Sequence, residues 1–308
     1  MEFLTPALKN ALIAVFSFLF ISHCLVLLIA NIKKGKDFSN LKLRMKSWWV
    51  ILSFLLLIFL TNKLIALITI GIMSALSLKE FLSFINFEKE DKSIILWMYL
   101  SIPLQIYFLY SDWMIMFYLF VPLYMFLILP LRRMFTGRVE NFIKVTSAAQ
   151  WGILLNVYAL GYLGAFLFIK TDTIKGAELL LFLLLINTLN DAFQYIWGKL
   201  FGKNKIVPKI SPNKTWEGFI GGMITTVLLS VTIAPYLTPM DLKFSILAGL
   251  LISVFGFFGD VVLSAVKRDA KVKDSSNLIP GHGGILDRVD SLTYTAPLFF
   301  HFICYFFL

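Results

Sequence analysis

The sequence is poor in charged residues and in cysteine. Asp, Glu, Lys and Arg together make up only 15% of its 308 residues, against about 25% in average soluble proteins. The two cysteines, Cys24 and Cys304, both lie inside apolar runs, without a partner at disulfide or metal-ligand spacing. The chain therefore has neither the polar stretches of a soluble domain nor a cysteine-based framework.

Apolar runs take the place of the missing charge. Hydrophobic residues account for 59% of the chain, and the mean hydropathy is +0.82. A helix needs about 20 apolar residues to cross a membrane, and such runs recur along the whole sequence. They predict one all-α integral membrane domain over residues 1–308, a polytopic protein with about ten transmembrane helices. The expected spans are 11–31, 48–61, 64–84, 93–110, 112–131, 148–169, 176–198, 217–238, 242–266 and 288–308.

The distribution of basic residues predicts how these spans are oriented. When residues near span ends are counted with the adjacent connection, 23 of the 28 Lys and Arg residues follow the odd-numbered spans. Basic residues concentrate on the cytoplasmic side of membrane proteins. We therefore expect a protein of a bacterial-type cell (inner) membrane with both termini outside. The net charge of +10 then reflects topology and contact with membrane lipids, not nucleic-acid binding.

Polar residues at membrane depth distinguish the two halves of the chain. Residues 1–147 have almost none in mid-span, which favours a mainly structural role for these helices. Residues 148–308 place Asn190, Asp191 and Asp260 within or near the ends of apolar spans. Ionisable groups there are costly, and they are functional candidates by default. We expect the chemistry in the C-terminal helices and their cytoplasmic loops.

The densest constellation runs from Asp260 to Asp290. On a helix, Asp260, Ser264, Lys267 and Arg268 project from one face. A loop rich in lysine and glycine follows, and it can approach phosphate oxygens closely. The alternatives are an intramembrane Asp satisfied by a neighbouring helix, and helix-dipole stabilisation of the last two aspartates. The further candidates in this segment are Lys273, Asp274, His282, Gly283, Gly284, Asp287, Arg288 and Asp290.

A second constellation covers the seventh predicted span and the loop after it. Its polar side chains lie largely on one helical stripe and continue into a basic loop. Ser211, Asn213 and Thr215 can donate to phosphate or cap a helix that begins near Trp216, and the lysines can equally be a solvated face. The candidates are Asn190, Asp191, Lys199, Lys203, Ser211, Asn213, Lys214 and Thr215.

These motifs resemble a known family. The segment from Ser264 to Asp290 resembles the signature of the phosphatidate cytidylyltransferases, also called CDP-diacylglycerol synthases. The strings Gly-x-x-Phe-Gly-Lys at 198–203 and Ser-Pro-Asn-Lys-Thr-x-Glu-Gly at 211–218 are similar to that family as well. The resemblance is good over about 185–295 and faint before it.

The resemblance implies transfer of a cytidylyl group from CTP to phosphatidate at the cytoplasmic membrane face. It implies Mg²⁺ as the cofactor, with K⁺ in the same metal centre, and pairing as a homodimer. The metal-binding acids would be Asp260 and Asp287. The expected catalytic residues are Asp260, Asp287, Lys267, Arg268, Asp290 and His282, with His282 a phosphate ligand or proton donor. The other candidates named above would bind substrate.

One departure from the family pattern concerns the acceptor. Bulky Phe193 and polar Gln194 stand where family members have small residues. The alternatives are therefore the same chemistry on another phospholipid or a polyprenyl phosphate, or a CTP-dependent lipid kinase. A transporter that uses Asp191 and Asp260 is a further alternative, although the charges gather in connected loops on one side.

Overall fold

The computed structural model describes residues 3–32, 38–85, 87, 91–137, 139–171, 174–276, 278–279, 281 and 283–308. Within these ranges the chain is helical and forms no β-strand, only three isolated bridges. The all-α prediction is confirmed. The helices are α1 (Pro6–Ile32), α2 (Ser39–Leu60), α3 (Lys63–Leu82), α4 (Lys92–Tyr110), α5 (Met114–Leu119), α6 (Phe126–Met134), α7 (Phe142–Ile153), α8 (Leu160–Phe166), α9 (Gly176–Phe201), α10 (Trp216–Leu237), α11 (Leu242–Asp269), α12 (Leu286–Val289) and α13 (Leu292–Phe307).

Two π-helical segments join shorter helices into longer ones. One, η2 (Phe120–Met125), connects α5 to α6, and the other, η3 (Leu154–Ala159), connects α7 to α8. In the second of these segments the Asn156 amide donates to the Gly152 carbonyl and accepts a hydrogen bond from Ser77 of α3. The buried amide thus joins η3 to a neighbouring helix.

Eight helices in the described ranges are long and apolar enough to cross a membrane, two fewer than predicted. The predicted span 288–308 is wrong in its start, because the chain turns at Asp290 and Ser291 and α13 has only 16 residues. The predicted span 148–169 is helical, but Gln150 and Asn156 lower its hydropathy, and all of α8 is buried inside the protein. The eight are 6–32, 41–60, 63–82, 92–110, 114–134, 176–201, 216–237 and 242–269.

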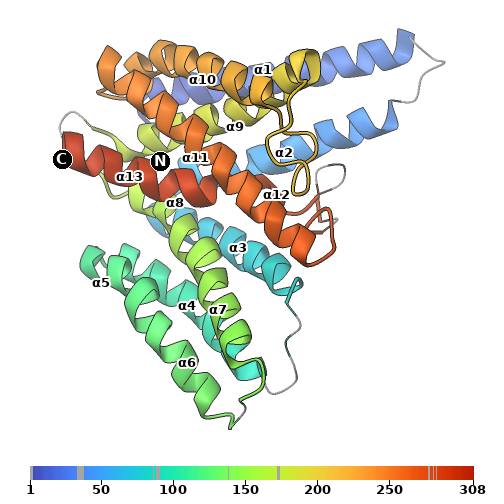
Figure 1. The fold of residues 1–308 in the computed structure, drawn as a ribbon. Helices are drawn as coiled ribbons and strands as arrows, with labels where there is room; N and C mark the ends of the chain where they lie inside the picture. Colours follow the sequence, from blue (N-terminus) through green and yellow to red (C-terminus); the bar gives the residue numbers. More distant parts are fainter. Residues whose placement is uncertain are drawn as a thin grey trace.

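The C-terminal helices pack around α9. Helix α10 lies against α9 along its length, α11 packs on both, and α13 lies against α8, α9 and α11 (Figure 1). Glycines permit the closest approach, because a Cβ on Gly222 would lie 2.4 Å from Gln194 Cγ and one on Gly218 would lie 2.8 Å from the Gln194 carbonyl oxygen. Helices α4 to α7 form a separate group at the lower side of the view (Figure 1).

The two termini lie at one end of this arrangement and the polar loops at the other (Figure 1). The loop between α9 and α10 and the segment between α11 and α12 both lie at the right of the view, whereas the N- and C-terminal labels are on the left. Thr215 starts α10 there, since its hydroxyl accepts a hydrogen bond from the Gly218 amide. The two constellations recognised in the sequence therefore share one end of the molecule.

Candidate active site

Three carboxylates from different elements meet near the polar end of the C-terminal helices. Asp191 lies on α9, Asp260 on α11, and Asp290 in the turn before α13. They are close enough for their charges to act on one another. The Lys214 ammonium, from the loop before α10, lies 2.7 Å from Asp260 Oδ2. Four segments that are distant in sequence thus contribute charge to one place.

Lys214 is held by a chain of polar side chains from α9. Its ammonium donates to Gln194 Oε1 at 3.4 Å, and the Gln194 amide donates to Asn190 Oδ1 at 3.1 Å. The Thr226 hydroxyl donates to the same Asn190 oxygen. Burial by itself would lower the pKa of Lys214, but Asp260 and Asp191 raise that pKa above its ordinary value. Lys214 therefore stays a cation at neutral pH.

A second ion pair joins the end of α11 to the start of α12. The described residues from Ser275 to Asp287, which lead into α12, are called the Asp287 turn below. Lys267 Nζ donates to Asp287 Oδ1 at 2.7 Å, and both side chains are buried. Asp287 Oδ2 accepts from the amides of Ser275 and Gly284, at 2.8 and 2.9 Å, and is 2.9 Å from the Ser275 hydroxyl. Burial by itself would raise the pKa of Asp287, but Lys267 and the Gly284 amide lower it below its ordinary value. Asp287 thus organises the turn as an anion.

The glycines of this turn are required by geometry. Gly283 has a φ of +78°, which L side chains rarely adopt, and a Cβ there would lie 2.5 Å from Asp287 Oδ2. A Cβ on Gly284 would lie 2.0 Å from the Ser275 hydroxyl oxygen and 2.2 Å from Glu80 Oε2. Both glycines were predicted to bind phosphate through their amides. The amide of Gly284 instead donates to Asp287 Oδ2.

Glu80 of α3 is a functional candidate that was not predicted from the sequence. Its carboxylate accepts hydrogen bonds from the Ser275 and Ser276 hydroxyls and from the Ile285 and Leu286 amides, at 2.7 to 3.1 Å. The first half of the chain therefore reaches the Asp287 turn. The sequence shows only that Ser74, Ser77 and Glu80 recur every three residues near one face of an apolar helix, which does not tell what this face contacts.

The residues of the predicted polar face of α11 have different partners in the structure. The Ser264 hydroxyl donates to Asp260 Oδ1 at 3.3 Å. Arg268 instead donates to two backbone carbonyls, of Ile210 at 3.1 Å and of Val272 at 2.9 Å. Because Ile210 belongs to the loop before α10, Arg268 ties the two polar loops together.

Ser291 forms hydrogen bonds with two of the three carboxylates, Asp191 and Asp290. Its hydroxyl donates to Asp191 Oδ2 at 3.0 Å and accepts from the Asn187 amide at 2.8 Å, while its own amide donates to Asp290 Oδ1. The other oxygen, Asp191 Oδ1, is buried and has no hydrogen-bond partner in the described part of the chain. A buried carboxylate oxygen without a partner is unusual in proteins, which makes Asp191 a candidate ligand for a cation.

For the remaining predicted residues, the structure shows no hydrogen bond or ion pair to the three carboxylates or to Asp287 among the described side chains. Thr215 caps α10, as the alternative interpretation allowed, and the Ser211 carbonyl accepts from the Lys214 amide. His282 lies outside the described residues. The side chains that are exposed, in the two loops or in the helices next to them, are those of Lys199, Lys203, Asn213, Lys273, Asp274 and Arg288.

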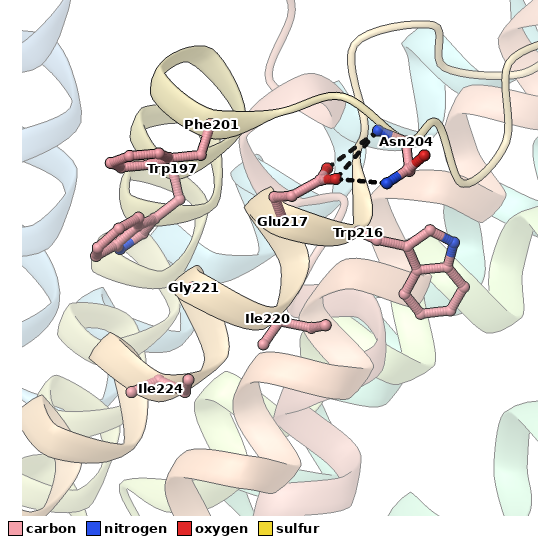
Figure 2. A pocket seen from close by; sticks show the side chains of 8 residues that line it. All are labelled: Trp197, Phe201, Asn204, Trp216, Glu217, Ile220, Gly221 and Ile224. Carbon is pink, nitrogen blue, oxygen red and sulfur yellow. Dashed lines mark hydrogen bonds between the residues drawn. The ribbon is translucent and has the colours of Figure 1, made fainter.

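A groove of about 550 Å³ lies on the outside of the α9–α10 pair, near the start of α10 (Figure 2). Trp197 and Phe201 lie on one side of Glu217, and Trp216 lies on the other (Figure 2). Glu217 accepts from the Lys203 and Asn204 amides and from the Asn204 side chain. The groove is mainly apolar, and the clustered aspartates do not line it.

Most of the chain matches one family. A model of the cytidylyltransferase family matches residues 42–306, which leave out only α1, the first three residues of α2 and the last residue of α13 among the helices described above. The chain belongs to the cytidylyltransferase family.

Several known proteins are similar to this chain in sequence. The uncharacterized protein YnbB of Escherichia coli (strain K12) is 43% identical over 264 residues, which cover 85% of this chain and 87% of YnbB. Phosphatidate cytidylyltransferases of Staphylococcus aureus (strain COL) and Staphylococcus epidermidis (strain ATCC 35984) are 42% and 41% identical over 143 and 142 residues. Those matches cover 46% of this chain and 55% of the staphylococcal enzymes. The chain thus matches about half the length of the two enzymes.

The donor set of this cytidylyltransferase fits a magnesium ion. Within the described ranges, no three Asp, Glu, His or Cys side chains converge as a complete metal cage. Magnesium needs no such cage, because it is commonly held by one or two carboxylates together with substrate phosphates. Lys267 bonds Asp287, and its charge also acts on Asp260. Each of the two predicted ligands thus already pairs with a lysine, Asp260 with Lys214 and Asp287 with Lys267.

Proposed function

We propose that this protein transfers the cytidylyl group of CTP to phosphatidate, forming CDP-diacylglycerol and releasing pyrophosphate. The observation that carries the proposal is the meeting of Asp191, Asp260, Asp290 and Lys214 beside the Lys267–Asp287 turn, in a chain of the cytidylyltransferase family. The named activity of the staphylococcal relatives supports phosphatidate as the acceptor.

The reaction asks the protein to bring two polyanions together. The phosphomonoester of phosphatidate is already ionised near neutral pH, so its attacking oxygen needs no strong general base. A new bond forms between that oxygen and the α-phosphorus of CTP, and the bond to the β-phosphate breaks with the electron pair leaving on pyrophosphate. In-line positioning and charge neutralisation are the main requirements of such a transfer.

The metal ligands in this proposal are Asp260 and Asp287, with K⁺ as a second ion of the same centre. Bound magnesium would neutralise charge on the reacting phosphates. Asp287 would take part once the triphosphate draws Lys267 away from it, since one oxygen of Asp287 now faces that ammonium. Asp191 supports the potassium proposal, because its Oδ1 is buried without a partner among the described residues.

Lysines and backbone donors would hold the nucleotide and the lipid phosphate. Lys214 and Lys267 are the cations nearest the carboxylates, and they would stabilise the departing pyrophosphate. Arg268, Lys273 and His282 would contact the outer phosphates. Arg268 would also keep the two loops together through the Ile210 carbonyl.

We also propose that this site faces the cytoplasm, with both termini on the opposite side and the protein paired as a homodimer. The placement of the loops and the termini at opposite ends supports the first two points (Figure 1). Cysteines placed at the exposed positions Lys203 and Tyr305 of a cysteine-free variant test the orientation in intact cells. Only the second should react with an impermeant maleimide.

Product analysis tests the proposed reaction. Purified protein in nanodiscs is incubated with α-³²P-labelled CTP, Mg²⁺ and a panel of phosphatidates, other phospholipids and polyprenyl phosphates. We expect label in a CDP-lipid and one pyrophosphate for each product. Release of CDP would instead indicate a lipid kinase, and counterflow in proteoliposomes without CTP would indicate a transporter.

A polyprenyl phosphate or another phospholipid is the second candidate acceptor. The specific observation in its favour is Gln194, which stands where family members have a small residue and contacts Lys214 beside the carboxylates. A CDP-polyprenyl product in the same panel, with phosphatidate inert, would decide for this candidate.

A further inference from the structure

We propose that Glu80 of α3 is a positioning residue for nucleotide transfer, which holds the two described ends of the turn, Ser275 and Leu286, together and thereby sets the place of Asp287. This proposal rests on the proposed function for its kinetic consequence. Its structural part, that Glu80 closes the turn, can be measured without any turnover.

The surroundings of Glu80 are those of a carboxylate built into a fixed position. Its side chain is 6% exposed, and a buried carboxylate is tolerated only where donors compensate its lost hydration. Four described donors do so, at 2.8 Å for Ser275 Oγ, 2.7 Å for Ser276 Oγ, 3.1 Å for the Ile285 amide and 2.8 Å for the Leu286 amide. All four belong to one turn, so Glu80 fixes both of its ends.

Ser275 carries this constraint to Asp287. Its hydroxyl oxygen lies 2.8 Å from Glu80 Oε2 and 2.9 Å from Asp287 Oδ2, and its amide donates to the same Asp287 oxygen. A hydroxyl has one proton, and the two carboxylates share it. A displacement of Glu80 therefore changes the donors that Asp287 has, and with them its hold on Lys267.

Packing confirms that the turn and the end of α3 form one unit. Phe81, the neighbour of Glu80, packs with Leu286 of α12, Leu263 of α11 and Leu155 of η3 in a small buried cluster. Gly284 leaves no room for a side chain between Glu80 and Ser275. The turn therefore packs directly against the carboxylate, with the backbone of Gly284 next to both Glu80 and Ser275.

The kinetic consequence is a weaker response to magnesium with normal lipid binding. In Glu80→Gln an NH₂ group replaces one acceptor oxygen and meets amide or hydroxyl donors that it cannot accept. We expect the half-saturating Mg²⁺ concentration to rise about tenfold, with the half-saturating lipid concentration changed less than twofold. Glu80→Asp keeps the charge with a shorter reach and should recover part of the loss.

The matched control is Ser77→Ala, one turn earlier on α3. Ser77 is as buried as Glu80 and also makes a long-range hydrogen bond, but to Asn156 of η3 and not to the turn. Loosening of α3 as a whole would affect both variants alike. We expect the magnesium response of Ser77→Ala to match that of the wild type.

Hydrogen exchange provides the readout that is independent of activity. The amides of Ile285 and Leu286 donate to Glu80, so a peptide that contains them should exchange about ten times faster in Glu80→Gln and at the wild-type rate in Ser77→Ala. Unchanged exchange in Glu80→Gln, or the same acceleration in both variants, would overturn the proposal. So would faster exchange with an unchanged magnesium response in an active protein. If no lipid accepts the cytidylyl group, the proposed function fails, and the exchange result still decides whether Glu80 closes the turn.

Discussion

The two lysine–aspartate pairs of the site have the same length and different surroundings. Lys214–Asp260 and Lys267–Asp287 both measure 2.7 Å. The first pair is 20% and 25% exposed, and beyond Lys214 the described donor to Asp260 is Ser264. The second pair is 10% and 7% exposed, and the Asp287 oxygen that faces away from Lys267 is occupied by Ser275 and Gly284. The first pair is therefore the easier one to separate, whereas Asp287 keeps its two backbone donors even when Lys267 leaves it.

The difference in exposure predicts different roles for Asp260 and Asp287, which look alike in the sequence. A partly exposed ion pair contributes less to stability than a fully buried one, so Lys214 and Asp260 can separate when a triphosphate and a metal compete for them. A buried, hydrogen-bonded carboxylate is costly to disturb. Asp287 is therefore expected to matter both for the fold of the turn and for the reaction, and Asp260 mainly for the reaction.

The largest effect should come from Asp287→Asn. The change leaves Lys267 without its partner and places an NH₂ group among the donors of Ser275 and Gly284. We expect turnover of CTP to fall at least about 100-fold and the free energy of unfolding to fall by roughly 3 kcal/mol. Activity and thermal unfolding in detergent measure the two losses. Near wild-type turnover at saturating magnesium would remove Asp287 from the metal site.

Asp260→Asn should separate reaction from stability. Turnover should again fall about 100-fold, whereas the free energy of unfolding should change by less than about 1 kcal/mol because the pair with Lys214 is partly exposed. The same two assays, run beside Asp287→Asn, sharpen the contrast between the pairs. A loss of stability as large as that of Asp287→Asn would show that the Lys214–Asp260 pair stabilises the fold as much as the Lys267–Asp287 pair does.

Gln194→Met should have a smaller effect, confined to the open pair. Methionine keeps the bulk that packs against Gly222 and removes the oxygen that Lys214 contacts at 3.4 Å. Such a long hydrogen bond is weak, so we expect the half-saturating CTP concentration to rise only about two- to threefold. Tyr195→Phe, at an exposed neighbouring position, is the control. Equal effects of the two changes would contradict a role for Gln194 in holding Lys214.

The smallest effect is expected from pH across the neutral range. A carboxyl whose pKa is lower in the folded protein stabilises the fold above its ordinary pKa of about 3.9, and this contribution disappears as the pH falls through the folded pKa. The pKa of Asp287 is lowered. The stability difference between wild type and Asp287→Asn should therefore stay constant from about pH 5 to 9 and shrink only below about pH 4. A difference that shrinks between pH 5 and 7 would mean that Asp287 is protonated there.

Sequence patterns predicted the parts of the site that depend on one helix. The spacing on α11 placed Asp260 beside Ser264, and the hydroxyl of Thr215 was expected near the start of α10. Helical periodicity fixes the direction of a side chain from its own axis. It does not fix which neighbouring helix that side chain meets.

Pairings between elements therefore could not be predicted. Nothing in the spacing says that Lys267 meets Asp287 while Lys214 meets Asp260, because both lysines follow from motifs that suit a phosphate equally well. Glu80 was missed for the same reason. A glutamate next to Lys79 near the end of an apolar helix has the appearance of a residue at the membrane surface.

The separation of Glu80 from its partners in the sequence has a consequence for biosynthesis. The amides of Ile285 and Leu286 follow Glu80 by 205 and 206 residues. At a synthesis rate of 5–20 residues per second, α3 waits about 10 to 40 s for the segment that it binds. The turn that holds Asp287 can therefore form only after the ribosome has passed Leu286, and a nascent chain that has not yet reached this residue contains α3 without the segment that it binds.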